Sequence, residues 1–249
     1  MSGAPRPAAL TLHLVRHGAA DGAAGRCIGH TDLPLSARGR ADVARLAAGW
    51  PAPPPARLVA SDLARAQASA DALLGAWWGA AGAPAPAVAV DARLREMDFG
   101  RWEGRSWAEI ERDDAVAMHA WMRDWQDAAA PGGEGFGDVV ARAAAWLADE
   151  VRAAADGASG GCGDPDAPDD GRRVVVLHAG SIRALLVHAL GLPRALAFRL
   201  RVDQARVSVL RVPVAAPGGG AGAGELVSLN ADRVAAADGV DGPPGSLDR

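Results

Sequence analysis

The chain has 249 residues, of which 49% are hydrophobic and 22% are charged, and its formal net charge is -4. This composition is typical of a globular protein with one large domain or two small ones. The net charge gives no electrostatic reason to expect binding to nucleic acid or to a membrane surface, and no apolar run approaches the roughly 20 residues of a membrane span.

The N-terminus and the cysteines both favour a cytoplasmic location. The stretch MSGAPRPAA is polar and contains two prolines, and it lacks the long apolar centre of a secretion signal. The two cysteines are Cys27 and Cys162, and Cys162 lies in a stretch rich in glycine and aspartate. We therefore expect no stabilising disulfide, which agrees with a reducing compartment.

Short apolar runs alternate with amphipathic stretches along the chain. The predicted strands are residues 10–16, 57–60 and 173–178, with a late hairpin at 207–212 and 225–230. The predicted helices are residues 37–49 after Ser36, a helix opened by Asp62, a helix after the SWAE capping box at 106–109, and residues 136–155 and 181–190. The alternation predicts an α/β fold, a three-layer α/β/α sandwich with a mostly parallel central sheet.

Three segments have the composition of flexible chain. They are residues 1–7, 156–172 and 234–249. No internal repeat is visible, and we expect a single domain over residues 1–249.

The sequence LVRHG at 14–18 ends the first predicted strand with polar residues. Arg16, His17 and Gly18 lie at the carboxyl end of that strand, where open α/β sheets bind their ligands. A lone histidine there is usually a core residue with one satisfied hydrogen bond. The adjacent arginine changes this expectation, because a buried guanidinium needs an anion and its planar fork suits phosphate or carboxylate.

Three further segments carry candidate residues. Arg65 lies in the first turns of the second helix, and Glu96 and Glu103 lie in a glycine-containing loop. Taken alone, Arg65 is interpreted as an arginine on the solvent-exposed face of a helix. Glu96 and Glu103 are interpreted as solvent-exposed carboxylates of a loop. His178 ends the third strand, and Gly180 leads into a helix whose N-terminus favours anions.

Together these residues suit phosphoryl transfer. Arginines and a helix N-terminus neutralise a phosphate, a neutral imidazole attacks phosphorus, and a carboxylic acid protonates the departing oxygen. The neighbouring arginine is expected to lower the pKa of His17 and keep the ring unprotonated.

Two other chemistries are disfavoured. His13 and His17 have a spacing that suits zinc on a helix, but on a strand four residues span roughly 13 Å. A P-loop is excluded because the chain contains no lysine. We therefore expect neither a metal ion nor a cofactor.

Five motifs, in this order, resemble the histidine phosphatase superfamily, also called the phosphoglycerate-mutase-like family. They are LVRHG at 14–18, PLSARG at 34–39, SDLARA at 61–66, LREMDFGRWEG at 94–104 and HAGSIR at 178–183. The resemblance implies the family fold, with His17 as the nucleophile that becomes phosphohistidine. It implies that Glu96 is the general acid that later activates water, with His178 completing the catalytic set. The implied phosphate-binding residues are Arg16, Gly18, Arg65 and His178, with Gly18 leaving room for the phosphoryl group.

The chain also departs from the family pattern. After RHG the family often has Glu-Thr and a later Asn, whereas this chain has Ala19, Ala20 and Ala23. The usual QTA after the second arginine is Ala68-Ser69-Ala70. Either phosphate binding is weaker than in the family, or backbone groups replace the missing side chains, and the reaction class is the same in both cases.

Three segments resemble the α-ribazole phosphatase branch: GHTDLPLS at 29–36, RDWQDAAAPGGEGF at 123–136 and FRLRVDQARVSVL at 198–210. This resemblance implies hydrolysis of α-ribazole 5′-phosphate during assembly of the cobalamin nucleotide loop. The expected substrate-binding residues are Gly29, His30, Trp102 and Gly180. A flat benzimidazole ring suits stacking on a tryptophan. Packing is the simpler interpretation, because Trp121 and Trp125 share one face of a helix.

Two alternatives stay open. One is a broad-specificity phosphatase or phosphoglycerate mutase-like enzyme of the same superfamily, although a mutase would need more cations in the segment that covers the site. The other is a catalytically silent module that binds phosphorylated ligands, which the retained residues at 17, 96 and 178 disfavour. In each case the expected partner is a small phosphomonoester.

Overall fold

The computed structural model describes residues 7–51, 57–79, 85–156, 170–214 and 222–234. The strands are β1 (Ala9–Arg16), β2 (Arg57–Ala60), β3 (Ala89–Val90), β4 (Arg172–Leu177), β5 (Val207–Pro213) and β6 (Glu225–Ala231). The α-helices are α1 (Ala37–Ala48), α2 (Ala64–Trp78), α3 (Trp107–Asp124), α4 (Phe136–Asp156) and α5 (Ala179–Leu190). Short 3₁₀ helices lie at Ala92–Leu94, Gly100–Trp102 and Arg194–Arg199. The segments expected to be flexible lie almost entirely outside the described residues.

The strands form one sheet in the order β3-β2-β4-β1-β5-β6. The pairs β3–β2, β2–β4 and β4–β1 are parallel, and β5 runs antiparallel to both β1 and β6. The late hairpin is therefore confirmed, as is the mostly parallel sheet. Residues 173–177 of β4 are all buried. This central strand is covered on both faces, which agrees with its unbroken apolar run.

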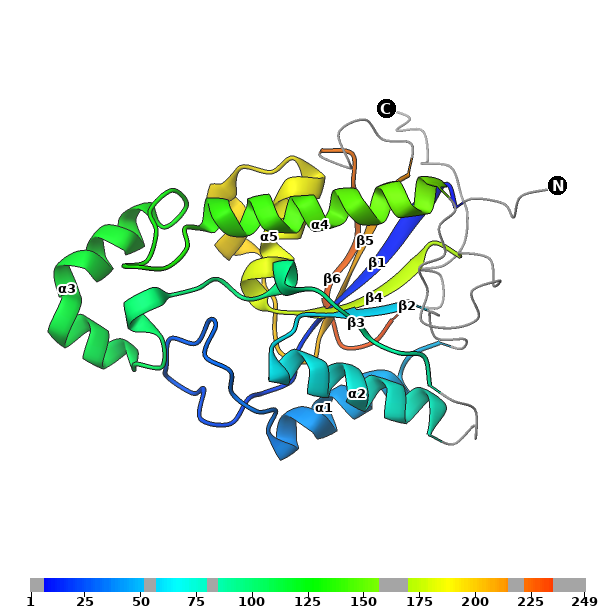
Figure 1. Ribbon diagram of the computed structural model, residues 1–249, viewed down its shortest axis with the longest axis horizontal. Coiled ribbons are helices and arrows are strands. Elements are labelled where there is room, and N and C mark those ends of the chain that lie inside the picture. Colours follow the sequence, from blue (N-terminus) through cyan, green and yellow to red (C-terminus); the bar gives the residue numbers. More distant parts are fainter. Residues whose placement is uncertain (1–6, 52–56, 80–84, 157–169, 215–221, 235–249) are drawn as a thin grey trace, which may run out of the picture.

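Helices cover both faces of this sheet (Figure 1). The core between the sheet and α1 and α2 contains Val15, Val43 and Leu73, whereas the core on the other face contains Leu14, Val139 and Ile182. The fold is thus the predicted three-layer α/β/α sandwich. Helix α3 extends away from the sheet at the left of Figure 1.

Two element boundaries differ from the prediction. His178 does not belong to β4: the strand ends at Leu177, and His178 is the N-cap of α5, which begins two residues earlier than predicted. Asp62 does not open α2, because its carboxylate accepts hydrogen bonds from Arg95. The N–H of Ala64 at the start of α2 instead donates to Asp32, 2.7 Å away. Within the described residues, no helix is long and apolar enough to cross a membrane.

Candidate active site

The polar residues that end β1 and β4 meet at one edge of the sheet. The two strands are parallel neighbours, and Arg16 lies opposite Leu177 in the ladder. The next residues, His17 and His178, therefore lie side by side, with ring centroids 4.9 Å apart and an interplanar angle of 59°. This is the carboxyl edge, where parallel α/β sheets bind ligands.

His17 is held as a neutral imidazole whose Nε2 has no hydrogen-bond partner among the described residues. Its Nδ1–H donates to the carbonyl oxygen of Gly18 at 2.6 Å, which leaves Nε2 as the unprotonated nitrogen. The ring is only 6% exposed. Burial, then the charges of Arg65 and Arg16, lowers the pKa of His17 to about 3 despite the hydrogen bond to Gly18. An unprotonated Nε2 is the form that attacks phosphorus.

Two arginines bring positive charge to this edge. The Nη1 and Nη2 groups of Arg65 donate to the carbonyls of Thr31 at 2.9 Å and Gly29 at 2.6 Å. Arg16 donates from Nη1 to the carbonyl of Val202 at 2.7 Å, and its buried Nε has no partner among the described residues. Burial is the main cause of a lowered pKa in both guanidinium groups. Carbonyl partners fix the two groups without neutralising them, so their charge is available to an anion.

His178 is fully buried, and its ring nitrogens Nδ1 and Nε2 lack hydrogen-bond partners among the described residues. Burial, then the interaction with the neighbouring His17 ring and the charge of Arg65, lowers the pKa of His178 well below its usual value, so the ring is neutral. A buried polar group without a partner costs free energy. A phosphate oxygen that accepts a hydrogen bond from the ring N–H of His178 would remove that cost.

Glu96 reaches the same edge from the loop after β3. Its carboxylate accepts from the N–H of Gly180 and from the N–H of Met97, each at 3.0 Å. A Cβ atom at position 180 would lie 2.0 Å from Oε1 of Glu96, so only glycine leaves room for this carboxylate. Gly180 therefore acts by placing Glu96 beside the start of α5.

Arg142 of α4 fixes the backbone around Glu96. Its Nη1 donates to the carbonyls of Arg93 and Arg95, each at 2.7 Å, and its Nη2 donates to the carbonyl of Glu96 at 2.8 Å. Its Nε donates to Glu134 at 2.9 Å. His30 adds a further contact, from Nε2 to the carbonyl of Glu96 at 2.9 Å. No motif in the sequence indicates this role for Arg142.

Glu103 organises the loop that holds Arg65. Its carboxylate accepts from the backbone N–H groups of Gly29 at 3.2 Å, His30 at 2.8 Å and Thr31 at 2.9 Å. Burial alone would raise the pKa of Glu103, but hydrogen bonds, first from the side chain of Thr31, outweigh burial and lower it. A Cβ at position 29 would lie 1.9 Å from the carbonyl oxygen of Met97, so this approach requires Gly29.

Glu103→Gln is expected to weaken phosphate binding without removing a group that touches phosphate. The amide nitrogen cannot accept hydrogen bonds, so loop 29–31 loses part of its anchor and Arg65 loses fixed carbonyl partners. We expect the inhibition constant of inorganic phosphate to rise by about tenfold and the free energy of unfolding to fall by about 1–3 kcal/mol. Glu111→Gln on the exposed face of α3 is the matched control. An unchanged inhibition constant would limit Glu103 to a structural role.

The low pKa of His17 predicts a pH-dependent stability. The unfolded chain binds a proton at His17 below about pH 6.5, whereas the folded chain does so only below about 3. Stability is therefore highest above pH 6.5 and falls as the pH drops through this window, by about 1.4 kcal/mol per pH unit for one proton. In urea unfolding at pH 4.5, 5.5 and 6.5, His17→Asn is expected to reduce this slope. Parallel stability curves for the two proteins would contradict the shift.

Two residues have surroundings other than those expected. A Cβ at Gly18 would lie 2.4 Å from the carbonyl oxygen of Gly39, so glycine is required here for packing against α1. Its N–H donates to Ser69 Oγ at 3.1 Å. Trp102 is fully buried, packs against Trp121 and donates to Asp114, so it has no face to offer a substrate ring. The burial of Trp102 therefore argues against its expected contact with a substrate ring, whereas Gly18 as a phosphate contact stays a prediction.

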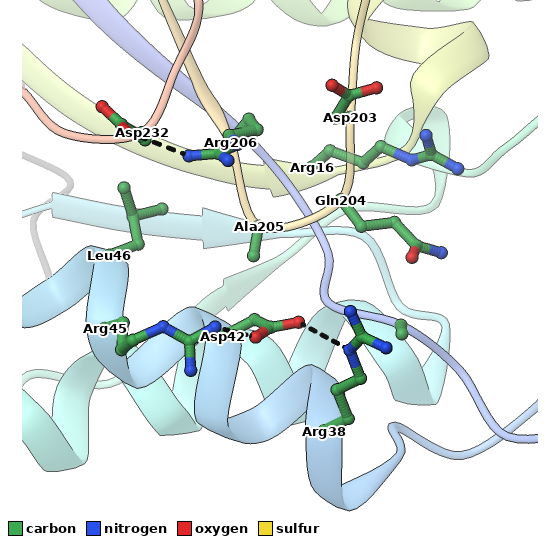
Figure 2. Close-up of a pocket in the computed structure, with 11 residues that line it drawn as sticks. Arg16, Arg38, Asp42, Arg45, Leu46, Asp203, Gln204, Ala205, Arg206 and Asp232 are labelled. Atoms are coloured by element: carbon green, nitrogen blue, oxygen red, sulfur yellow. Dashed lines mark hydrogen bonds and ion pairs between the residues drawn. The ribbon is translucent and has the colours of Figure 1, made fainter.

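A cavity of about 1010 Å³ adjoins Arg16 (Figure 2). It lies between α1 and residues 203–206, and its charges are largely paired with one another. Asp42 pairs with Arg38 and with Arg45, as the dashed lines show. The other proposed catalytic side chains, all in the described part of the chain, do not line this cavity, so it borders the site and is not its centre.

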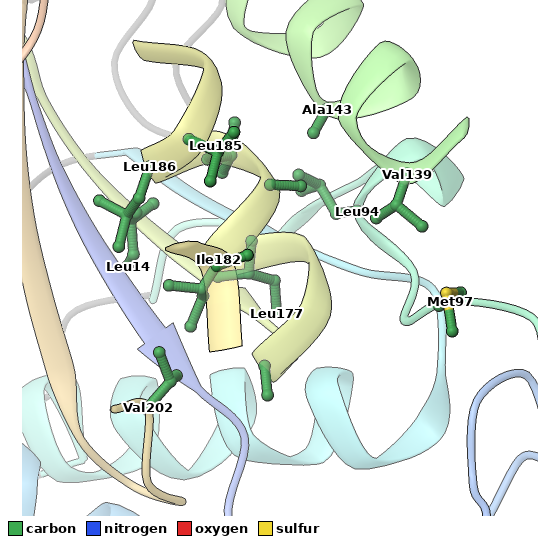
Figure 3. Close-up of a cluster of buried hydrophobic side chains, with 14 of the residues drawn as sticks. Leu14, Leu94, Met97, Val139, Ala143, Leu177, Ile182, Leu185, Leu186 and Val202 are labelled. Atoms are coloured by element: carbon green, nitrogen blue, oxygen red, sulfur yellow. The ribbon is translucent and has the colours of Figure 1, made fainter. Parts of the chain in front are cut away.

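Apolar packing beneath the site fixes the segments that carry it (Figure 3). Leu94 and Met97 flank the backbone of Glu96, and Leu177 and Ile182 lie on either side of the turn at His178. These side chains are at most 5% exposed. The catalytic groups therefore project from a close-packed core, which limits their movement. Within the described residues, no group of three or more His, Cys, Asp or Glu side chains could hold a metal ion.

Alignments with curated relatives cover most of this chain. It is 37% identical over 188 residues to a glucosyl-3-phosphoglycerate phosphatase of Mycobacterium tuberculosis, covering 74% of this chain and 77% of the relative. It is 29% identical over 197 residues to an adenosylcobalamin/alpha-ribazole phosphatase of Salmonella typhimurium, covering 78% and 87%.

The fold also matches solved structures. A putative alpha-ribazole-5′-P phosphatase from Escherichia coli superposes with a TM-score of 0.72 at 27% identity, covering 91% of this chain and 98% of that one. The family model for the histidine phosphatase superfamily (branch 1) matches residues 12–215, a range that contains all the site residues described above. The relatives support phosphatase activity, and the chain belongs to the histidine phosphatase superfamily.

Proposed function

We propose that the protein is a phosphomonoesterase that works through a phosphohistidine at His17. The observation that carries the proposal is the buried, neutral His17 ring with Nδ1 occupied by Gly18 and Nε2 free. The unpartnered ring of His178 lies 4.9 Å from it, centroid to centroid. Arg16 and Arg65 supply the charge that a phosphate dianion requires.

The first step transfers the phosphoryl group to the protein. Nε2 of His17 attacks phosphorus and forms a P–N bond, while the ester P–O bond breaks and its electron pair goes to the leaving oxygen. Glu96, in its protonated form, gives that oxygen a proton, so the alcohol leaves neutral. Arg16, Arg65 and His178 hold the phosphoryl oxygens throughout.

The second step returns the protein to its starting state. The Glu96 carboxylate takes a proton from a water molecule, whose oxygen attacks phosphorus and displaces Nε2 of His17. Inorganic phosphate leaves, and Glu96 is again protonated. Because the residues named here supply the nucleophile, the proton and the charge neutralisation, we propose that no metal ion takes part, and we expect turnover to be unchanged by EDTA.

Two substrates are supported by separate observations. The segments at 29–36, 123–136 and 198–210, with the E. coli structural match, support α-ribazole 5′-phosphate and hence a role in cobalamin assembly. The greater identity to a glucosyl-3-phosphoglycerate phosphatase supports a phosphorylated glycerate ester. The burial of Trp102 removes one structural reason to expect a benzimidazole ring.

A substrate panel tests this proposal. Release of inorganic phosphate is measured from α-ribazole 5′-phosphate, glucosyl-3-phosphoglycerate, p-nitrophenyl phosphate and 3-phosphoglycerate. We expect hydrolysis of p-nitrophenyl phosphate and a higher kcat/KM for one of the first two esters. Isomerisation of 3-phosphoglycerate at a rate equal to or above hydrolysis would identify a mutase instead. Phosphate binding without turnover of any ester would identify a silent binding module.

A further inference from the structure

A third arginine, Arg183, lies at the edge of the site. It follows Gly180 by three residues on α5, so the two share one face of the helix. Helical side chains point back toward the N-terminus, which directs Arg183 toward the turn where Gly180 holds Glu96. Its electrostatic neighbours agree with this placement. Burial and the charge of Arg16 lower the pKa of Arg183, while Glu96 and Asp203 oppose that shift.

The end of the Arg183 guanidinium is free. Its Nε donates to the carbonyl of Leu200 at 3.0 Å, and its central carbon lies 5.2 Å from the ring centroid of Phe198. These contacts fix the plane of the group. Within the described residues, its two Nη groups form no hydrogen bond and no ion pair. A guanidinium held in this way presents two parallel N–H donors, which match the two oxygens of a carboxylate.

Phe198 forms an apolar surface next to this fork. Its ring is packed at 4.2 Å from that of Trp125, centroid to centroid, yet the residue is 52% exposed. Asp203, the other carboxylate whose charge acts on Arg183 besides Glu96, is already paired with Arg201 at 2.7 Å. Among the described residues, therefore, no carboxylate forms an ion pair with Arg183.

The charge balance of the site indicates a second anionic group on the substrate. Arg16 and Arg65 together match the two negative charges of a phosphate ester. Most other described arginines, such as Arg93 and Arg142, have a carboxylate within 4.0 Å, whereas Arg183 does not. Because Glu96 protonates the leaving oxygen, a cation beside Glu96 faces the leaving alcohol and not the transferred phosphate.

We infer that Arg183 binds a carboxylate of the leaving group, so that the preferred substrates are phosphate esters of hydroxy acids. This inference rests on the proposed function, because it takes the leaving group to lie on the Glu96 side. It makes Arg183 a specificity-determining residue, with Phe198 packing against the carbon chain of the same group.

Two esters that differ in one group test the inference. D-3-Phosphoglycerate and glycerol 3-phosphate share a three-carbon skeleton and a phosphate, but the first has a carboxylate where the second has a hydroxymethyl group. Hydrolysis of both is followed by phosphate release, and the ratio of their kcat/KM values is compared between proteins. The wild-type ratio is expected to favour phosphoglycerate, and Arg183→Gln is expected to lower it by about tenfold or more.

Two further variants complete the experiment. Arg183→Lys keeps the charge and loses the planar fork, so it is expected to have an intermediate ratio and serves if the glutamine variant does not fold. Arg199→Gln removes an equal charge from an exposed position and is expected to leave the ratio unchanged. A ratio unaffected by both Arg183 variants, or no wild-type preference for phosphoglycerate, would overturn the inference. Failure of the proposed function would instead appear as no hydrolysis of any ester by the wild type.

Discussion

His17→Ala is expected to lower kcat by about 10⁴-fold or more, because the variant has no nucleophile to split the displacement into two steps. The expected loss is the same for p-nitrophenyl phosphate and for alkyl phosphates, since every substrate must pass through the same imidazole. Steady-state phosphate release measures it. His119→Ala is the matched control, because His119 is exposed on α3 and, among the described residues, pairs only with Glu111.

Residual turnover of His17→Ala would contradict the role of His17 as nucleophile. His17→Ala with more than about a tenth of wild-type turnover, and with the control unaffected, would show that another group attacks phosphorus. Inorganic phosphate binding by the variant, measured by calorimetry, separates a lost nucleophile from a collapsed site.

Glu96→Gln is expected to lower kcat by about 10²–10⁴-fold on alkyl phosphates, because the amide cannot protonate the leaving oxygen or activate water. The loss in the first step is expected to be smaller with p-nitrophenyl phosphate, because nitrophenolate leaves without a proton. The burst of nitrophenolate in rapid mixing measures that first step alone. The variant is therefore expected to release a burst and then turn over slowly.

Glu111→Gln, on the exposed face of α3, is the control for this variant. Equal losses with both kinds of leaving group, and no burst, would indicate that Glu96 acts by positioning rather than by proton transfer. The hydrogen bonds from Met97 and Gly180 can be accepted by the glutamine oxygen, so the variant preserves much of the local geometry.

The sequence predicted the fold because its apolar runs have strand length and its amphipathic runs have helix length. The unbroken run in β4 and the alternation of strands and helices are local signals, and the structure confirms them. The boundaries between elements are harder to predict from the sequence. His178 continues the apolar run of β4 in the sequence, and only the structure shows that it caps α5.

The candidate site was predicted through its motifs, and the structure brings His17, Arg65, Glu96 and His178 to one edge of the sheet. The roles of their supporting residues escaped prediction because each acts across long sequence distances. Glu103 resembles a solvated loop acid until the chain brings loop 29–31 onto it. Arg142 lies on a helix face and gives no local sign that it holds the Glu96 loop.

Gly18 and Trp102 show what a motif or a local composition cannot predict. A motif identifies Gly18 as important, but the reason lies in the backbone of Gly39, which the motif does not reveal. Trp102 lies in a segment rich in tryptophan, and composition alone cannot decide between a stacking surface and a core. The structure assigns it to the core, against Trp121.

Mapping the covalent intermediate tests the account most directly. The enzyme is mixed with a ³²P-labelled phosphate ester, quenched in alkaline denaturant that preserves phosphohistidine, and digested with trypsin. Cleavage after Arg16 and Arg26 yields the peptide HGAADGAAGR, whose only histidine is His17. We expect label on this peptide, forming within the first turnover. Label on a peptide containing His178, or no label in an enzyme that is turning over, would contradict it.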